Sequence, residues 1–371
     1  MEYTQQTLYT LISGITGPDR EAMSAAEKRQ AQLAKPPGSL GRLEHLSVQL
    51  AGITGKVCNK TDNKTLLVFC ADNGVVREGV ATTPQTVTLA QTVNLARGKT
   101  GAAVLAKQFG CAVRVCDVGV NANIKEPAVI GRKIAYGTKN IAAGPAMTED
   151  QALRAILTGA QLAMETAQTG ADVIGVGEMG IGNTTTAAAV LAVLTGSPVP
   201  NVTGRGAGLT DEAYAKKIAV IERALRVNAP DKDNVIDVLA KVGGFDIAAM
   251  CGAFLGAAIM RRPAVIDGFI SAVAALCAVR LCPNVNHFLI PSHASFEHGS
   301  RIVMDALQLK PLFDLDMRLG EGSGCPLSML LLDAACAVIN DMATFREAAI
   351  DDGYLEPLRQ IDAFTVRGDN A

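Results

Sequence analysis

The stretch Gly175–Thr186, with the sequence GVGEMGIGNTTT, decides the fold of this chain. It follows an apolar segment, residues 171–174, that is typical of a buried strand, and it precedes an alanine-rich run that is typical of a helix. Strand, glycine-rich turn and helix in this order hold phosphate, because unpaired backbone N–H groups and the helix dipole point at one spot. The stretch predicts an α/β fold with an anion-binding turn. A turn that only allows helix and strand to pack closely is the alternative.

The same stretch indicates which kind of phosphate is bound. From Gly177 it resembles a P-loop, but Asn183 stands where a lysine would reach the β- and γ-phosphates. It also matches GxGxxG, yet no acid follows about 20 residues later to hold a ribose hydroxyl. The three threonines that follow Asn183 add hydroxyl donors. A monophosphate is therefore favoured over a triphosphate or a dinucleotide.

Composition excludes several classes of function. The 371 residues carry a net charge of −2 without a basic run, which gives no support for binding to nucleic acid or to a membrane surface. The nine cysteines are scattered, no CxxC occurs, and the segment after Met1 has no signal-peptide pattern. The longest uncharged apolar run, residues 247–260, is too short to span a bilayer. We expect a soluble, cytoplasmic protein with reduced thiols.

Short apolar segments alternate with longer helical ones after about residue 60. Each apolar segment ends in a polar or glycine-rich turn, and the runs between them are long enough for crossover helices. This pattern predicts a doubly wound parallel sheet whose turns meet at one edge, where ligands bind. The chain ends, up to about residue 60 and after about 325, are predicted to be helical and to pack together. The predicted strands are residues 65–70, 112–116, 171–174, 264–266 and 287–290.

A second glycine-rich segment, residues 318–326 with the sequence RLGEGSGCP, contains a single carboxylate. Glycines around Glu321 let the backbone approach a ligand and leave the carboxylate uncrowded. In an apolar pocket such a carboxylate acts as a general base. The alternative, a carboxylate bonded to the N–H groups of its own loop, stays open. Asp314 and Asp316 are expected to be structural, as partners of Arg318 or as turn caps.

Other polar segments carry weaker indications. Arg205, between two glycines, can reach an anion or lie at the surface. Lys217, two turns into a predicted helix, is on its own expected to be solvated. His293 and His298 are five residues apart, on different faces of a helix, and HExxH is absent, so no metal site is predicted.

Together these segments resemble the nicotinate-nucleotide–dimethylbenzimidazole phosphoribosyltransferase family, which makes the lower-ligand nucleotide of cobamides. The resemblance runs in family order from about residue 35 to about 345. The matching segments are KPPGSLGRLE (35–44), ADNGVV (71–76), GEMGIGNTT (177–185), GRG (204–206), GGFD (243–246), DGF (267–269), SHAS (292–295) and RLGEGSG (318–324).

The resemblance implies an activity and an architecture. A 5-phosphoribosyl group passes from nicotinate mononucleotide to 5,6-dimethylbenzimidazole or a related base, giving α-ribazole 5'-phosphate and nicotinate without metal or cofactor. The implied fold is a Rossmann-like parallel sheet with a smaller helical domain built from both chain ends. The domain boundaries would be 1–60, 61–325 and 326–371. A homodimer is implied, with no nucleic-acid or membrane partner.

The resemblance also implies roles for individual residues. Glu321 would be the base that removes the N–H proton of the acceptor, and Glu178 would face the ribose. Thr83, Gln91, Ser295 and Leu319 would line the acceptor-base pocket. The nucleotide and its phosphate would be bound by Gly177, Glu178, Gly180, Gly182, Asn183, Thr184, Gly204, Arg205, Gly206 and Lys217.

The chemistry required is compatible with these residues. A nicotinate attached as a pyridinium is already a good leaving group, so the reaction needs a phosphate anchor, one base and a dry pocket. Asn73 departs from many relatives, which have histidine there, and this leaves the acceptor open among benzimidazoles, adenine and phenols. An inactive nucleotide-binding subunit is the rival that would lack the base. An NAD-dependent oxidoreductase would need the missing ribose acid.

Overall fold

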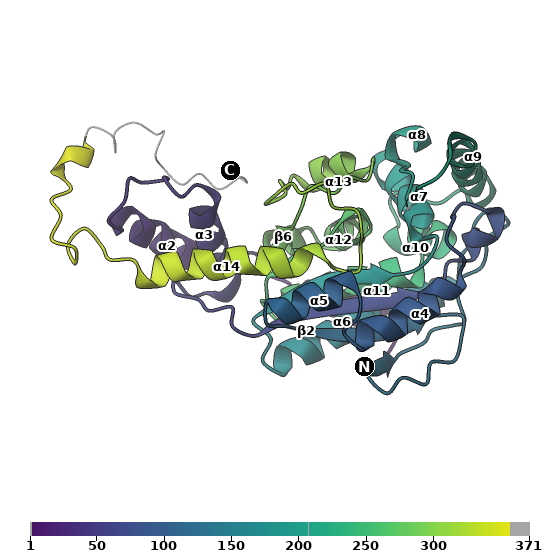
Figure 1. Ribbon diagram of the computed structural model, residues 1–371, viewed down its shortest axis with the longest axis horizontal. Coiled ribbons are helices and arrows are strands. Elements are labelled where there is room, and N and C mark those ends of the chain that lie inside the picture. Colours follow the sequence, from purple (N-terminus) through teal and green to yellow (C-terminus); the bar gives the residue numbers. More distant parts are fainter. Residues whose placement is uncertain (1, 207, 357–371) are drawn as a thin grey trace.

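The computed structural model describes residues 2–206 and 208–356, and in these residues the strands form one parallel sheet (Figure 1). The strand order β3-β2-β1-β4-β5-β6 is the doubly wound order, with its reversal between β1 and β4. The predicted parallel α/β fold is confirmed. The strands are β1 (Lys64–Ala71), β2 (Cys111–Gly119), β3 (Val129–Gly131), β4 (Val173–Met179), β5 (Ala264–Ile266) and β6 (Leu289–Pro291).

Two features of the sheet differ from the sequence prediction. The short edge strand β3 was not predicted, because its three residues are only partly buried or exposed and do not form a buried apolar segment as those of β5 do. β4 continues through Met179, so half of the glycine-rich stretch is strand and only residues 180–182 form the turn. Gly175 and Gly177 lie inside β4 because another segment approaches the strand closely there: a Cβ at Gly177 would lie 2.5 Å from the Gly322 nitrogen.

Helices cover both faces of the sheet (Figure 1). Side chains alternate along β1, so that Leu66 and Val68 enter one core layer while Leu67 and Phe69 enter the other. The first layer is closed by α4 (Thr86–Ala96), α5 (Gly101–Gln108) and α14 (Gly324–Asp341). The second is closed by α6 (Glu149–Gln168), α7 (Asn183–Thr195), α11 (Phe245–Ile259) and α12 (Phe269–Leu281).

A separate small core lies at the far end of α14 (Figure 1). There Ala26, Val48 and Ile339 bring together α2 (Arg20–Gln32), α3 (Arg42–Thr54) and the last turns of α14. α1 (Gln5–Ser13) instead packs against α6 and α11 of the main layer. We propose that α2, α3 and the end of α14 form the smaller domain. Residues 357–371 of the predicted third segment lie outside the described residues.

α14 has the length and apolar composition of a membrane span, but half of it is buried inside the fold, where Met329 and Leu332 belong to the sheet core. It is therefore a core helix. The remaining α-helices in the part of the chain that the structure describes are α8 (Val199–Val202), α9 (Asp211–Asn228), α10 (Val235–Val242) and α13 (Ser300–Leu307).

Helices α6 and α11 touch through glycines. A Cβ at Gly252 would lie 1.7 Å from the Ile156 carbonyl oxygen, and one at Gly159 would lie 1.8 Å from the Ala249 carbonyl oxygen. These obstacles are backbone atoms, which cannot rotate aside as a side chain can. The two helices must separate if either glycine gains a side chain.

Gly252→Ala is therefore expected to lower the free energy of unfolding by about 1–3 kcal/mol or more. Urea denaturation of the purified protein measures this. Gly131→Ala is the matched control, because no atom lies within 4 Å of a Cβ built there. Equal stability of the two variants would contradict the close contact.

Candidate functional site

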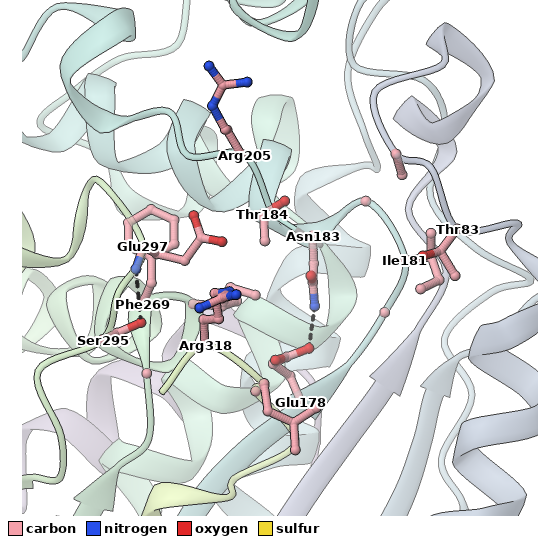
Figure 2. Close-up of a pocket in the computed structure, with 18 of the residues that line it drawn as sticks. Thr83, Glu178, Ile181, Asn183, Thr184, Arg205, Phe269, Ser295, Glu297 and Arg318 are labelled. Carbon is pink, nitrogen blue, oxygen red and sulfur yellow. Dashed lines mark hydrogen bonds between the residues drawn. The ribbon is translucent and has the colours of Figure 1, made fainter. Parts of the chain in front are cut away.

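A pocket opens beyond the carboxyl ends of β4 and β5, as the doubly wound order predicts (Figure 2). Its walls come from segments far apart in the chain. Of the residues expected at the site, the structure brings to this pocket Thr83, Glu178, Gly180, Gly182, Asn183, Thr184, Arg205, Gly206, Lys217, Ser295 and Leu319.

The glycine-rich turn delivers the N-terminus of α7 to the pocket. Gly182 has a left-handed φ of 94°, and a Cβ at Gly180 would lie 2.4 Å from the Ala71 carbonyl oxygen, so both positions require glycine. Of the three consecutive threonines, only Thr184 lines the pocket. Thr185 and Thr186 are fully buried behind it, which corrects the expectation that all three hydroxyls serve a ligand.

Lys217 is buried beside this turn rather than solvated. Its Nζ donates hydrogen bonds to Thr184 Oγ1 at 2.9 Å and to the Gly204 carbonyl oxygen at 3.0 Å. Burial lowers the pKa of Lys217 to about 8, while the nearby Glu297 carboxylate opposes that shift. Sequence alone suggested a solvated lysine because its partners come from other segments. An ammonium group and the N-terminus of α7 thus face the same space, which suits an anion.

Arg205 and Gly204 are both expected near the phosphate, but the Arg205 guanidinium is bonded elsewhere and Gly204 does not line the pocket. The Arg205 guanidinium bonds to Asp211 at 2.5 Å and to the Leu209 carbonyl oxygen at 2.9 Å, and it points away from Thr184 (Figure 2). Gly204 lies outside the lining: a Cβ there would lie 1.8 Å from a Glu297 carboxylate oxygen. In this structure Arg205 offers the pocket no free charge.

Two buried acids meet beside the turn. The Asn183 amide donates to the Glu178 carboxylate and, at 3.1 Å, to Asp246 Oδ2. Burial, with the charge of Asp246, raises the pKa of Glu178 to about 8, and burial raises that of Asp246 to about 6. Glu178 therefore holds a proton at neutral pH. Asp246 escaped sequence reasoning, because its glycine-to-helix segment is explained equally well by packing.

Asn73 lies behind this acid pair. Its Nδ2 is 3.4 Å from Asp246 Oδ2, its Oδ1 accepts from Thr186 Oγ1 at 3.3 Å, and it is fully buried. It is not among the residues that line the pocket. The position that departs from the family pattern therefore acts on the acid pair and not directly on a ligand.

Glu321 faces the middle of α4 and the N-terminus of α5. One carboxylate oxygen accepts from Gln91 Nε2 and the other from the Ala102 backbone N–H at the start of α5, both at 3.3 Å. Its carboxylate thus bonds to α4 and α5, and neither of these hydrogen bonds goes to its own loop. Leu319 packs over Gly101 nearby, while Gly320, between Leu319 and Glu321, borders the pocket.

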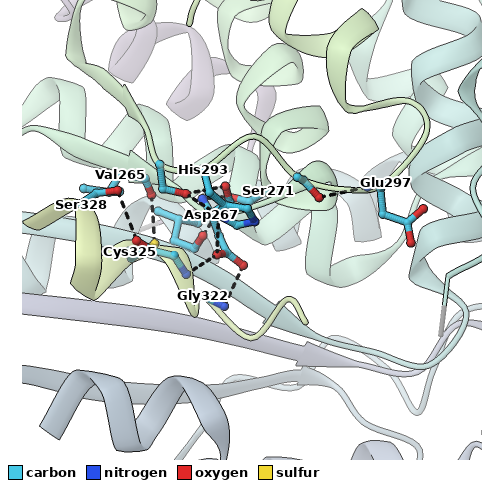
Figure 3. A network of polar contacts seen from close by, with 12 residues as sticks. Val265, Asp267, Ser271, His293, Glu297, Gly322, Cys325 and Ser328 are labelled. Carbon is cyan, nitrogen blue, oxygen red and sulfur yellow. Dashed lines mark hydrogen bonds and ion pairs between the residues drawn. The ribbon is translucent and has the colours of Figure 1, made fainter. Parts of the chain in front are cut away.

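The loop that carries Glu321 is held by Asp267 (Figure 3). Asp267 Oδ1 accepts from the Gly324 N–H at 2.8 Å and Oδ2 from the Gly322 N–H at 3.0 Å. The sequence alone does not identify this role of Asp267, since its partners lie 55 and 57 residues away in the chain. A Cβ at Gly320 would lie 2.5 Å from Glu178 Oε1, so the Glu321 loop and the acid pair are adjacent.

The rest of the lining completes two walls. Ser295 lies across the pocket from Thr83, beside Glu297 and Phe269 (Figure 2). Asp314 Oδ1 accepts from the Asp316 N–H at 3.3 Å, as expected of a turn cap. Neither Asp314 nor Asp316 is among the ion-pair partners found in residues 2–206 and 208–356. Arg318 lines the pocket, which the sequence did not predict, and its guanidinium group lies over the Phe296 ring.

Comparisons with known proteins agree on one family. A family model described as phosphoribosyltransferase matches residues 15–350. The nicotinate-nucleotide–dimethylbenzimidazole phosphoribosyltransferase of Clostridium acetobutylicum is 49% identical over 341 residues, covering 92% of this chain and 97% of the relative. That of Clostridium tetani is 46% identical over 97% of this chain and 100% of its own. The crystal structure of CobT from Thermus thermophilus superposes with a TM-score of 0.86 at 40% identity, covering 90% of this chain and 100% of that one.

The protonated Glu178 makes stability depend on pH. The pKa of Glu178 is raised from 4.5 to about 8 in the folded chain, so the folded state binds the extra proton and stability falls as pH rises through this window. Glu178→Gln lacks this loss. We therefore expect the free energy of unfolding of the variant, taken relative to that of the wild type, to rise by at least about 1 kcal/mol from pH 5 to pH 9. One pKa unit corresponds to about 1.4 kcal/mol. Urea denaturation of both proteins at both pH values measures it, and a constant difference would contradict the buried proton.

Proposed function

The chain belongs to the nicotinate-nucleotide–dimethylbenzimidazole phosphoribosyltransferase family, and from that premise we propose how its pocket works. The enzyme is a pentosyltransferase that moves the 5-phosphoribosyl group of nicotinate mononucleotide to 5,6-dimethylbenzimidazole or a related base, in cobamide nucleotide-loop synthesis. The observation that carries the proposal is the Glu321 carboxylate, fixed by Gln91 and the start of α5 on a loop whose Gly320 borders the pocket.

The phosphate is proposed to bind at the N-terminus of α7. There the Thr184 hydroxyl, the Lys217 ammonium and the backbone around Gly206 converge, and each can donate to a phosphate oxygen. Charge-assisted hydrogen bonds of this kind, in a site removed from water, hold the nucleotide in one orientation. The ribose then extends toward Glu178, which in its protonated form donates to a ribose oxygen.

The transfer step requires one base. A ring nitrogen of the acceptor attacks C1′ of the ribose, and the bond from C1′ to the nicotinate nitrogen breaks. The bonding electrons go to that nitrogen, so nicotinate leaves without needing a proton. The attacking base becomes cationic, and Glu321 takes its N–H proton from the other ring nitrogen. Thr83, Gln91, Leu319 and Ser295 are proposed to contact the acceptor.

The proposal is tested by nicotinate release from nicotinate mononucleotide. Separate reactions contain 5,6-dimethylbenzimidazole, benzimidazole, adenine or p-cresol, and mass spectrometry identifies each product. Release that depends on the added base supports the transfer and ranks the acceptors. Nucleotide binding without release by any of these bases would overturn the proposed activity.

Glu321→Gln is expected to bind nicotinate mononucleotide as the wild type does but to lose at least about 100-fold in kcat with benzimidazoles. The amide retains the shape of the side chain and cannot accept the proton. Isothermal titration and steady-state kinetics measure the two quantities. The nearby variant Gln91→Glu tests the hydrogen bond to Glu321 without removing the base. Unchanged turnover of Glu321→Gln would remove Glu321 from the role of base.

The assembly and location are also proposed from family resemblance and surface features. The large apolar side chains Phe296 and Leu319, which line the pocket region, and Leu315 are each more than half exposed, which is typical of a surface covered by a second copy. We expect a homodimer, and light scattering of the purified chain measures its molar mass. A monomer at micromolar concentration would contradict this. The nine unpaired cysteines favour the cytoplasm, which cell fractionation tests.

A further inference from the structure

A short chain of hydrogen bonds orients the His293 ring and assigns a hydrogen to its Nδ1 (Figure 3). Ser292 Oγ donates to the Asp267 carbonyl oxygen at 2.7 Å, and His293 Nδ1 lies 3.0 Å from Ser292 Oγ. A hydroxyl has a single hydrogen, which here is used on the carbonyl group. His293 Nδ1 must therefore be the donor to Ser292. In the neutral ring this leaves Nε2 without a hydrogen, as an acceptor.

The acceptor at Nε2 has no partner within the described chain. His293 is 1% exposed, and its Nε2 is a buried polar atom without a hydrogen bond. The ring cannot turn to find one without breaking the bond to Ser292, and it also stacks on Phe313. A buried polar atom left unpaired is costly, so such atoms in native proteins have a partner or a functional reason.

Nε2 faces the nucleotide pocket at Gly268. A Cβ built on Gly268 would lie 3.5 Å from His293 Nε2 and 3.5 Å from Ser295 Oγ. All three residues line the pocket. The missing side chain of Gly268 thus leaves a small polar recess, with the imidazole nitrogen and the serine hydroxyl on its sides.

We propose that His293 Nε2 accepts a hydrogen bond from a ribose hydroxyl of the bound nucleotide and thereby selects a ribonucleotide. This rests on the proposed function, in which nicotinate mononucleotide is the donor substrate. Its dianionic phosphate and its carboxylate offer only acceptors, so the ribose hydroxyls are its donors. The N–H of the acceptor base is assigned to Glu321, whose carboxylate is turned toward α4 and α5. His293 is therefore a binding and positioning residue for the ribose.

Two substitutions separate this contact from a structural role. His293→Gln places an amide oxygen near the position of Nε2, whereas His293→Asn has no atom there and retains a polar group near Nδ1. His293→Asn should weaken binding of nicotinate mononucleotide about 3- to 10-fold, the range for a neutral hydrogen bond. His293→Gln should restore most of it. Isothermal titration measures the affinities, and thermal unfolding checks that both variants fold.

The 2′-deoxy and 3′-deoxy forms of nicotinate mononucleotide identify the hydroxyl. The wild type should bind one of them about 3- to 10-fold more weakly than the ribonucleotide, and His293→Asn should bind that analogue and the ribonucleotide equally. A wild type that binds all three nucleotides alike overturns the inference, even if neither variant folds. So does a His293→Asn protein that still discriminates as the wild type does. Base-dependent nicotinate release by the wild type tests the proposed function separately, so the two failures are distinguishable.

Discussion

The site depends on two hydrogen bonds that the Asp267 carboxylate accepts from backbone N–H groups of the Glu321 loop. Asp267 directly follows β5, and its two oxygens bond to Gly322 and Gly324, so that the loop is tied to the carboxyl end of this strand. The loop needs this support because Glu321 has a left-handed φ of 62°, which is unfavourable for a residue with a side chain. A strained residue keeps its conformation only where its surroundings hold it, and here they aim its carboxylate at α4 and α5.

Charged side chains of both signs lie in and around the pocket. Lys217 bonds to Thr184 at the start of α7, and the acids Glu178 and Asp246 share the amide of Asn183. Glu321 bonds to Gln91 and to the start of α5. Burial keeps one proton on the acid pair, which avoids two adjacent charges in a low dielectric. Gly177, next to Glu178 in β4, closely approaches Gly322, next to Glu321. This contact brings the acid pair and the Glu321 loop together.

The sequence predicted what depends on local pattern. Apolar segments followed by glycine-rich turns revealed the parallel sheet and the edge that binds ligand, and the lone carboxylate of the 318–326 segment indicated a base. Lys217, Asp246, Asp267 and His293 could not be predicted from the residues alone. Lys217, Asp246 and Asp267 each depend on a partner far away in the chain, such as Thr184 for Lys217 and Gly322 for Asp267. His293 is linked through its neighbour Ser292 to the Asp267 carbonyl group, 25 residues from Ser292. For the same reason the predicted strand ends at residue 174, whereas β4 continues to Met179. Its glycines Gly175 and Gly177 pack against the distant segment 322–325.

Asn73 acts on the acid pair from behind the pocket, because it is buried and is not among the residues that line the pocket. Its amide cannot carry a charge, so it stabilises Asp246 only through a hydrogen bond of 3.4 Å, shared with the amide of Asn183. A cationic side chain at this position would favour ionised Asp246, and the charge of Asp246 is one cause of the raised pKa of Glu178. Position 73 therefore tunes where the acid pair keeps its proton.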